Sequence, residues 1–153
     1  MKSPHLLLIV IIFLLSCTGY DCARAETRFG FVGFSGTEAN PVIFRKFEKG
    51  RDFSVLIDTI LITPANIGYS FSGDTLQFSG FTADLILKSD FDYEMVLPNA
   101  GRTFRLGKIR EEFQSKKWSL STTKEMCVNP IVGYELDGRM STGQNIYYIF
   151  LPR

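Results

Sequence analysis

The chain has 153 residues, and its 17 Lys and Arg residues nearly balance its 16 Asp and Glu residues. With 45% hydrophobic and 14% aromatic residues, it can bury enough apolar surface to offset the entropy lost on ordering, which argues against intrinsic disorder. The lack of a strong Lys and Arg excess argues against a protein built to bind nucleic acid. The length is that of about one domain.

Residues 1–25 have the three regions of an export signal. Lys2 gives a positive start, Leu6 to Leu15 form an apolar run, and Ala23-Arg24-Ala25 supplies small residues at the positions that a signal peptidase reads. The run is too short for a transmembrane helix, which needs about 20 apolar residues. We therefore predict cleavage after Ala25, with the mature chain beginning at Glu26 and residues 26–153 forming a single all-β domain.

A second cleavage site would change the number of cysteines retained. The segment Leu14-Leu15-Ser16-Cys17 resembles the lipobox of bacterial lipoproteins, whose cysteine is acylated and becomes the first residue. Its second leucine stands where a smaller residue is usual. If Cys17 is the first residue, Cys22 and Cys127 are both retained and can form a disulfide in an oxidising compartment. Cleavage after Ala25 leaves only Cys127.

Both cleavage sites place the protein outside the cytoplasm. Small secreted domains of eukaryotes tend to be rich in disulfides, so a cysteine-poor exported chain is more typical of a bacterial periplasm. We expect a periplasmic protein of a Gram-negative bacterium. The alternative is an outer-membrane lipoprotein acylated at Cys17, and contact with a membrane is expected only in that case.

From Glu26 onward, short apolar runs alternate with turn residues, which is the spacing of an all-β domain. About nine or ten strands of this kind predict a mainly β fold, either an antiparallel sandwich or a partly closed barrel. The expected strands, in chain order, lie at 28–32, 42–47, 53–63, 69–71, 76–78, 81–87, 91–97, 103–106, 132–136 and 146–151.

One segment has a different period. Leu106, Ile109 and Phe113 recur at the spacing of an amphipathic helix. Glu111 and Glu112 precede two lysines, an order that agrees with the helix dipole. The pattern predicts a single short helix over residues 108–117.

The sequence excludes several kinds of catalytic site. His5 is the only histidine and lies in the predicted signal, so the mature chain contains none. A Ser-His-Asp or Cys-His arrangement and a zinc site with histidine ligands are therefore impossible. We assign no catalytic residue, no cofactor and no metal ligand.

Three acidic residues alternate along one predicted strand. Asp90, Asp92 and Glu94 would project from the same face, where three carboxylates could bind calcium or act as an acid pair. The ordinary alternative is a solvated strand face. We favour this alternative, because calcium sites usually take their ligands from a turning loop.

A basic stretch follows this strand, with seven cations between positions 102 and 124 against two carboxylates. Such a stretch can attract an anionic polymer or lipid surface through its summed charge. The ordinary alternative is the solvated face of neighbouring elements. The candidate residues of this polyanion-binding patch are Arg102, Arg105, Lys108, Arg110, Lys116 and Lys117.

The sequence therefore favours a small exported protein that acts as a non-catalytic binding module. Its partner would be a periplasmic protein or an envelope polymer, and the sequence does not identify it or the oligomeric state. The alternative is a hydrolase of glycosidase type that uses carboxylates alone. Such an enzyme needs two carboxyl groups facing each other at about 5–9.5 Å.

Overall fold

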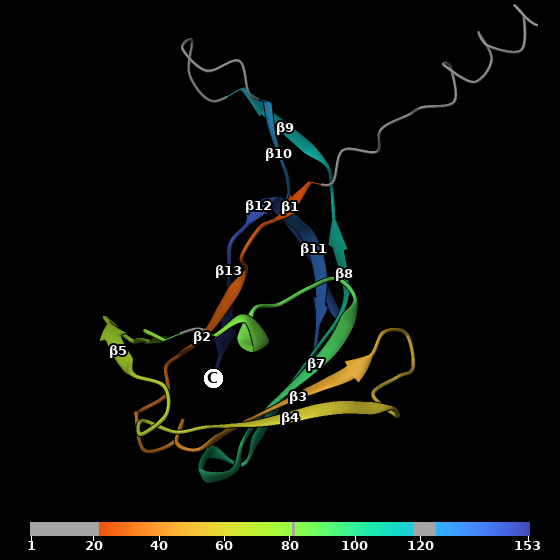
Figure 1. The fold of residues 1–153 in the computed structure, drawn as a ribbon. Coiled ribbons are helices and arrows are strands. Elements are labelled where there is room, and N and C mark those ends of the chain that lie inside the picture. Colours follow the sequence, from red (N-terminus) through yellow and green to blue (C-terminus); the bar gives the residue numbers. More distant parts are fainter. Residues whose placement is uncertain (1–21, 81, 118–124) are drawn as a thin grey trace, which may run out of the picture.

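The computed structural model describes residues 22–80, 82–117 and 125–153. The protein is mainly β, as the sequence predicts, and its two main sheets pack against each other as an open sandwich rather than a closed barrel (Figure 1). One sheet has six strands in the order β12-β11-β8-β7-β3-β4, and the other has four in the order β13-β2-β6-β5.

The six-stranded sheet is antiparallel throughout. Hairpins connect three of its neighbouring pairs, which are β3 with β4, β7 with β8, and β11 with β12. Its strands are β3 (Val42–Glu48), β4 (Leu56–Ile62), β7 (Phe91–Leu97), β8 (Arg102–Glu111), β11 (Ile131–Leu136) and β12 (Arg139–Ile146).

The four-stranded sheet joins the beginning of the domain to its end. Its outer strand β13 runs parallel to β2, whereas the other pairs are antiparallel. The strands of this sheet are β2 (Arg28–Val32), β5 (Tyr69–Ser72), β6 (Thr75–Phe78) and β13 (Tyr148–Pro152).

A narrow ribbon projects from one end of the sandwich (Figure 1). It continues the hairpin of β8 and β11 and consists of β9 (Gln114–Lys117) and β10 (Glu125–Asn129), which pair antiparallel. The short strand β1 (Ala23–Arg24) pairs parallel with β10. The sequence did not predict β1, β9, β10 or β12 as strands.

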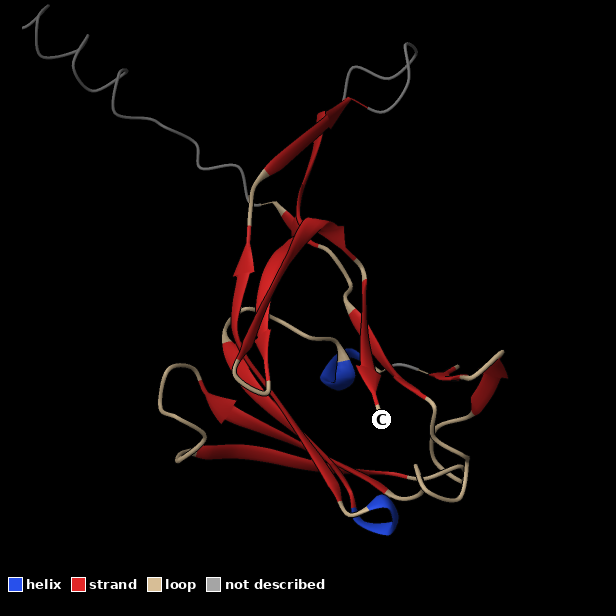
Figure 2. Ribbon diagram, turned by 180° about the vertical axis from the view of Figure 1, so that it is seen from behind, coloured by secondary structure: helices blue, strands red, loops and turns tan. Residues whose placement is uncertain are grey.

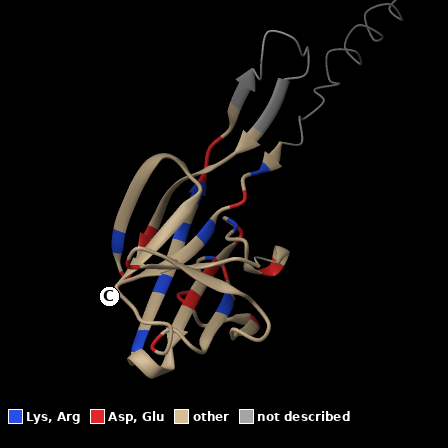
Figure 3. Cartoon of the chain, turned by 90° about the vertical axis from the view of Figure 1, so that its left-hand side faces the viewer, with Lys and Arg blue, Asp and Glu red and all other residues tan. Residues whose placement is uncertain are grey.

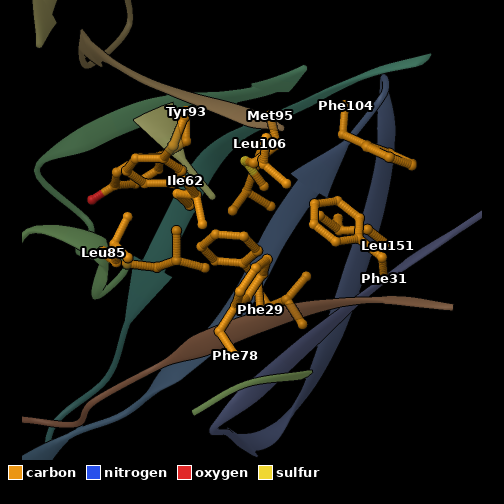
Figure 4. Packing of buried hydrophobic residues seen from close by; sticks show 14 of the residues in the cluster. Phe29, Phe31, Ile62, Phe78, Leu85, Tyr93, Met95, Phe104, Leu106 and Leu151 are labelled. Carbon is orange, nitrogen blue, oxygen red and sulfur yellow. The ribbon is translucent and has the colours of Figure 1, made fainter. Parts of the chain in front are cut away.

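The core lies between the two sheets and is built from alternating aromatic residues (Figure 4). Phe29 and Phe31 of β2 point inward because residues two apart in a strand share a face. The ring of Phe29 stacks on Phe44 of β3 at 5.4 Å between centroids, and the ring of Phe31 lies 5.9 Å from that of Phe104 on β8. All four side chains are fully buried.

The predicted helix over 108–117 is wrong, because residues 108–111 lie in β8 and residues 114–117 form β9. Gly133 and Glu135 of β11, two residues apart, pair with Arg110 and Gly107 of β8, which are three residues apart. Strand β8 therefore contains a bulge, and Lys108 within it has a positive φ of 50°. The bulge turns both Leu106 and Ile109 inward, so a bulged strand reproduces the three-residue spacing of a helix.

The predicted strand over 81–87 is also wrong for residues 82–87. Only Leu87 makes a bridge, to Thr27, and residues Ala83–Leu85 form a short 3₁₀ helix, η1. Leu85 and Leu87 nevertheless fill the core, with at most 1% of each side chain exposed. The apolar run at 82–87 therefore contributes to the core without forming a strand.

The helices of the described residues are short. They are η1 and a second 3₁₀ helix, η2 (Pro98–Ala100), which connects β7 to β8 (Figure 2). No helix in the described ranges has the length and apolar character needed to cross a membrane.

Replacing Phe44 should test the aromatic core. We expect Phe44→Ala to lower the free energy of unfolding by about 3–5 kcal/mol, because it removes a buried ring and leaves a cavity. The matched control is Phe113→Ala, since the Phe113 side chain is 63% exposed, and it should change stability by no more than about 0.5 kcal/mol. Urea denaturation measures both, and equal losses in the two variants would contradict this assignment of the core.

Candidate functional site

The outer face of the six-stranded sheet carries a row of alternating charges. Glu94 of β7 lies between Arg45 of β3 and Arg105 of β8, its cross-strand neighbours. Arg45 Nη1 is 2.8 Å from Glu94 Oε2, and Arg105 Nε is 3.2 Å from Glu94 Oε1. The side chain of Glu94 is only 8% exposed, so two guanidinium groups shield a buried carboxylate and occupy both of its oxygens.

Asp92 lies two residues before Glu94 on the same face and is also buried, at 5% exposed. Its Oδ2 accepts a hydrogen bond of 2.8 Å from the backbone N–H of Gly50, in the loop between β3 and β4. Its Oδ1 accepts one of 3.3 Å from the backbone N–H of Lys108, at the bulge of β8. One carboxylate thus connects a loop to a bulge that is distant in the sequence.

The backbone next to Asp92 is strained on both sides. In the loop, Asp52 and Phe53 have φ values of 48° and 56°, and Lys108 in the bulge also has a positive φ. Such conformations cost on the order of 1–3 kcal/mol each and persist only where surrounding contacts hold them. Here Phe53 packs edge-on against Phe47 at 5.6 Å, and the guanidinium of Arg105 lies 5.4 Å from the Phe53 ring centre.

A shallow pocket of about 280 Å³ lies between the loop and the bulge. Four of the five charged side chains in its lining have partners: Lys108 Nζ is 2.7 Å from Glu135 Oε2, Lys49 Nζ donates to the carbonyl of Ile109 at 3.3 Å, and Asp92 accepts the two bonds given above. The bond to Glu135 raises the pKa of Lys108. Asp52 is the one carboxylate of this lining that binds no group in the described part of the chain, so the pocket offers a single free carboxylate rather than a facing pair.

The structure separates the three predicted acidic residues. Asp90 pairs with Arg24, whereas Asp92 and Glu94 are each occupied by donors of their own. Within the described residues no group of three or more His, Cys, Asp or Glu side chains could hold a metal ion. The favoured alternative of a solvated face is also wrong for Asp92 and Glu94, because a loop and two arginines cover them.

Carboxylates from neighbouring strands and from the turn between β11 and β12 pair with several cations of the predicted basic patch. Arg102 Nη2 is 3.1 Å from Asp137 Oδ2, and Arg105 and Lys108 bind Glu94 and Glu135. Basic and acidic residues consequently alternate across the sheet (Figure 3). Arg110 is exposed on β8, and Lys116 and Lys117 lie at register positions opposite Met126 and Glu125 of β10.

The end of the predicted signal forms part of the fold. Ala23 and Arg24 pair with Val128 and Asn129, and the N–H of Ala25 donates to the carbonyl of Asn129 at 3.2 Å. The guanidinium of Arg24 binds Asp90 and lies 3.9 Å from Glu111. The hydrogen bond from Arg24 holds the pKa of Asp90 below its ordinary value of 3.8.

A disulfide lies next to this strand. Cys22 is disulfide-bonded, and the parallel register of Ala23 with Val128 places position 22 beside position 127. Cys127 is the other cysteine within the described ranges. Cys17, the alternative lipidation site, lies outside the described residues.

The apolar surface that sequence reasoning missed is the outer edge of the six-stranded sheet. Its last strand, β4, and the residue before it contain four of the nine large hydrophobic side chains that are exposed in the described residues. The sequence assigned this run to a strand, but only the strand order shows that β4 has a partner on one side alone. The four residues are Val55, Leu56, Ile57 and Leu61.

Comparison with known proteins gives no relative from which a function could be inferred. No protein-family model, curated protein or solved structure matches this chain.

Removing the Asp92 carboxylate should lower the stability of the loop and bulge on the outer face of the six-stranded sheet. Asp92→Ala leaves the N–H groups of Gly50 and Lys108 without this acceptor, and we expect a loss of about 1–3 kcal/mol in the free energy of unfolding. Hydrogen exchange at these two amides should also become faster. The control is Asp84→Ala at an exposed carboxylate of η1, and protection at Gly50 and Lys108 that survives Asp92→Ala would contradict the role given to Asp92.

The Arg24–Asp90 pair should make the attachment of β1 dependent on pH. The folded-state pKa of Asp90 is lowered, so its contribution to stability is present above its ordinary value of 3.8 and is lost as pH falls through the lowered value. Both side chains are almost half exposed, so the pair is worth roughly 0.2–1 kcal/mol.

We expect Asp90→Asn to speed hydrogen exchange at the Ala25 amide relative to the unmodified chain at pH 6. This difference should disappear well below pH 3.8, where the native carboxyl is also neutral. A difference that stays constant over this range would show that the charge of Asp90 does not hold β1.

Proposed function

We propose that the protein is a small exported envelope protein that acts by binding rather than by catalysis. The observation that carries export is the disulfide at Cys22, because disulfides form and persist mainly in oxidising compartments outside the cytoplasm. The export signal predicted from Lys2 and the apolar run agrees with this placement. A periplasm, or the periplasmic face of an outer membrane, supplies such an environment.

The carboxylate geometry supports binding over hydrolysis. A carboxylate-only hydrolase needs one carboxyl group to hold a proton and a second to stay free for water or the sugar. Glu94 gives both oxygens to arginines, Asp92 gives both to backbone N–H groups, and Glu135 binds Lys108. Each of these carboxylates holds strands together, and the hydrolase alternative gains no support from them.

A protein partner has more support than a polyanion. Arg105 and Lys108 each bind a carboxylate of a neighbouring strand, and Arg102 binds Asp137 in the turn between β11 and β12. The electrostatic field of β8 is therefore weaker than its sequence implies. The exposed apolar side chains of β4 instead offer a surface that water solvates poorly.

The contacts of β1 favour processing at Cys17 over processing after Ala25. Cleavage after Ala25 would remove β1, the ion pair of Arg24 with Asp90 and the disulfide of Cys22. Cleavage before Cys17 keeps all three and leaves a short spacer ahead of Cys22. We therefore favour an outer-membrane lipoprotein acylated at Cys17, with a Cys22–Cys127 disulfide that closes β1 onto β10.

Intact mass spectrometry of the chain recovered from the bacterial envelope tests this proposal. We expect a chain that begins at Cys17 and carries lipid, and a non-reduced digest that links the peptides of Cys22 and Cys127. The control Cys17→Ser should lose the lipid. A chain that begins at Glu26 would refute lipidation and leave export standing, whereas an unprocessed chain with free thiols in the cytoplasm would refute both.

A further inference from the structure

We propose that the protein forms a two-fold symmetric dimer in which β4 pairs antiparallel with β4 of a second copy. The two six-stranded sheets would then form one continuous sheet across the two-fold axis. This inference concerns self-association and goes beyond the binding function proposed above, since it does not depend on where the protein is located or whether it carries lipid.

The first observation is that the β4 edge is exposed and apolar. Among the described residues, strand β4 pairs only with β3, so its other side is the free edge of the sheet. Leu56, Ile57 and Leu61 are 53%, 51% and 52% exposed, and Val55 just before the strand is 42% exposed. A free strand edge with apolar side chains is a template for pairing with another strand.

The other edge strands of the two main sheets have features that hinder pairing with a further strand. Strand β12 has an irregular register with β11 and contains Gly143 and Asn145, the latter with a φ of 57°. Strand β5 has only four residues, and β13 ends in Pro152. Short strands, irregular backbone and proline are the usual protections of an edge against pairing.

Strand β4 has weaker protection. An extra residue, Ile57, lies between the partners of Lys46 and Phe47, which makes a bulge at the start of the strand. From Asp58 to Ile62 the pairing with β3 is regular, and Asp58 is the one charged residue of the strand.

The second observation is that the β4 sequence is complementary to itself. In an antiparallel pair centred on Thr59, Ile57 of one copy lies opposite Leu61 of the other, and Leu56 lies opposite Ile62. Asp58 lies opposite Ile60, so the two negative charges do not face each other. Centring the pair on Asp58 would place like charges opposite, which is unfavourable. The pairing of charges therefore favours the register centred on Thr59 over the one centred on Asp58, and such a contact is isologous and closes after two copies.

The third observation is an apolar row that reaches this edge. Ile43 of β3 pairs with Val96 of β7 on one side and with Leu61 on the other. Ile43 and Val96 are half-buried, whereas Leu61 is exposed. In the register centred on Thr59, Ile57 of the second copy extends this row beyond Leu61. The second copy therefore covers Leu61, the member of this row that is exposed in a single chain.

Sedimentation of the processed chain in a density-matched detergent tests the dimer, because the detergent makes attached lipid and micelles invisible. We expect the unmodified chain to shift from one copy to two with rising concentration. Leu61→Lys should remain a monomer, since it places a lysine at each end of the paired strands. The matched control is Met140→Lys, because Met140 is 57% exposed on the opposite edge strand β12, and it should dimerise like the unmodified chain.

A cross-link tests the register independently. Opposite residues of an antiparallel pair have Cα atoms about 4.5–5.5 Å apart, within the range that a disulfide spans. Thr59→Cys should give a covalent dimer on oxidation in solution, and the control Thr142→Cys on β12 should not. Circular dichroism of every variant checks that it is folded.

Three results would overturn the proposal. They are an unmodified chain that stays monomeric at all concentrations, a dimer that survives Leu61→Lys, and equal cross-linking of the two cysteine variants.

Discussion

The hydrogen bonds that Asp92 accepts from two backbone N–H groups position a loop and a bulge on the outer face of the six-stranded sheet. A buried carboxylate is costly unless hydrogen bonds replace its lost water, and here a loop and a bulge supply them. The bulge turns Ile109 into the core and allows Lys108 to reach Glu135. The loop holds Phe53 beneath Arg105. The charged row and the pocket therefore both depend on the same carboxylate.

The sequence predicts the architecture well because the core follows strict alternation. Phe29 and Phe31 are two residues apart in one run, Val42 and Phe44 are two apart in the next, and turn residues separate the runs. The helix prediction failed where alternation stops. A bulge and a helix both bring residues three apart to one face, and Gly107 immediately before Lys108 was the local signal for a bulge.

Other features escape sequence reasoning because they depend on partners distant along the chain. Ala23-Arg24-Ala25 matches a cleavage motif locally, yet the role of β1 depends on Val128 and Asn129, more than a hundred residues away. Asp21, Cys22 and Arg24 are unusual in a signal peptide near its cleavage site and were the available warning. Similarly, the run at 56–62 is readable as a strand, but its position at the edge of the sheet follows only from strand order.

The basic stretch shows why charge counted along a chain differs from charge presented on a surface. In an antiparallel sheet the nearest neighbours of Arg105 are Glu94 on β7 and the strand β11, which come from other parts of the sequence. These neighbours supply the carboxylates that bind Arg105 and Lys108. Such pairing reduces the uncompensated charge on the outer face, which is why we propose the apolar edge of β4, rather than the basic stretch, as the source of binding energy. The two kinds of surface respond oppositely to salt, because screening weakens attraction between exposed charges, whereas salts such as sulfate strengthen the burial of apolar surface.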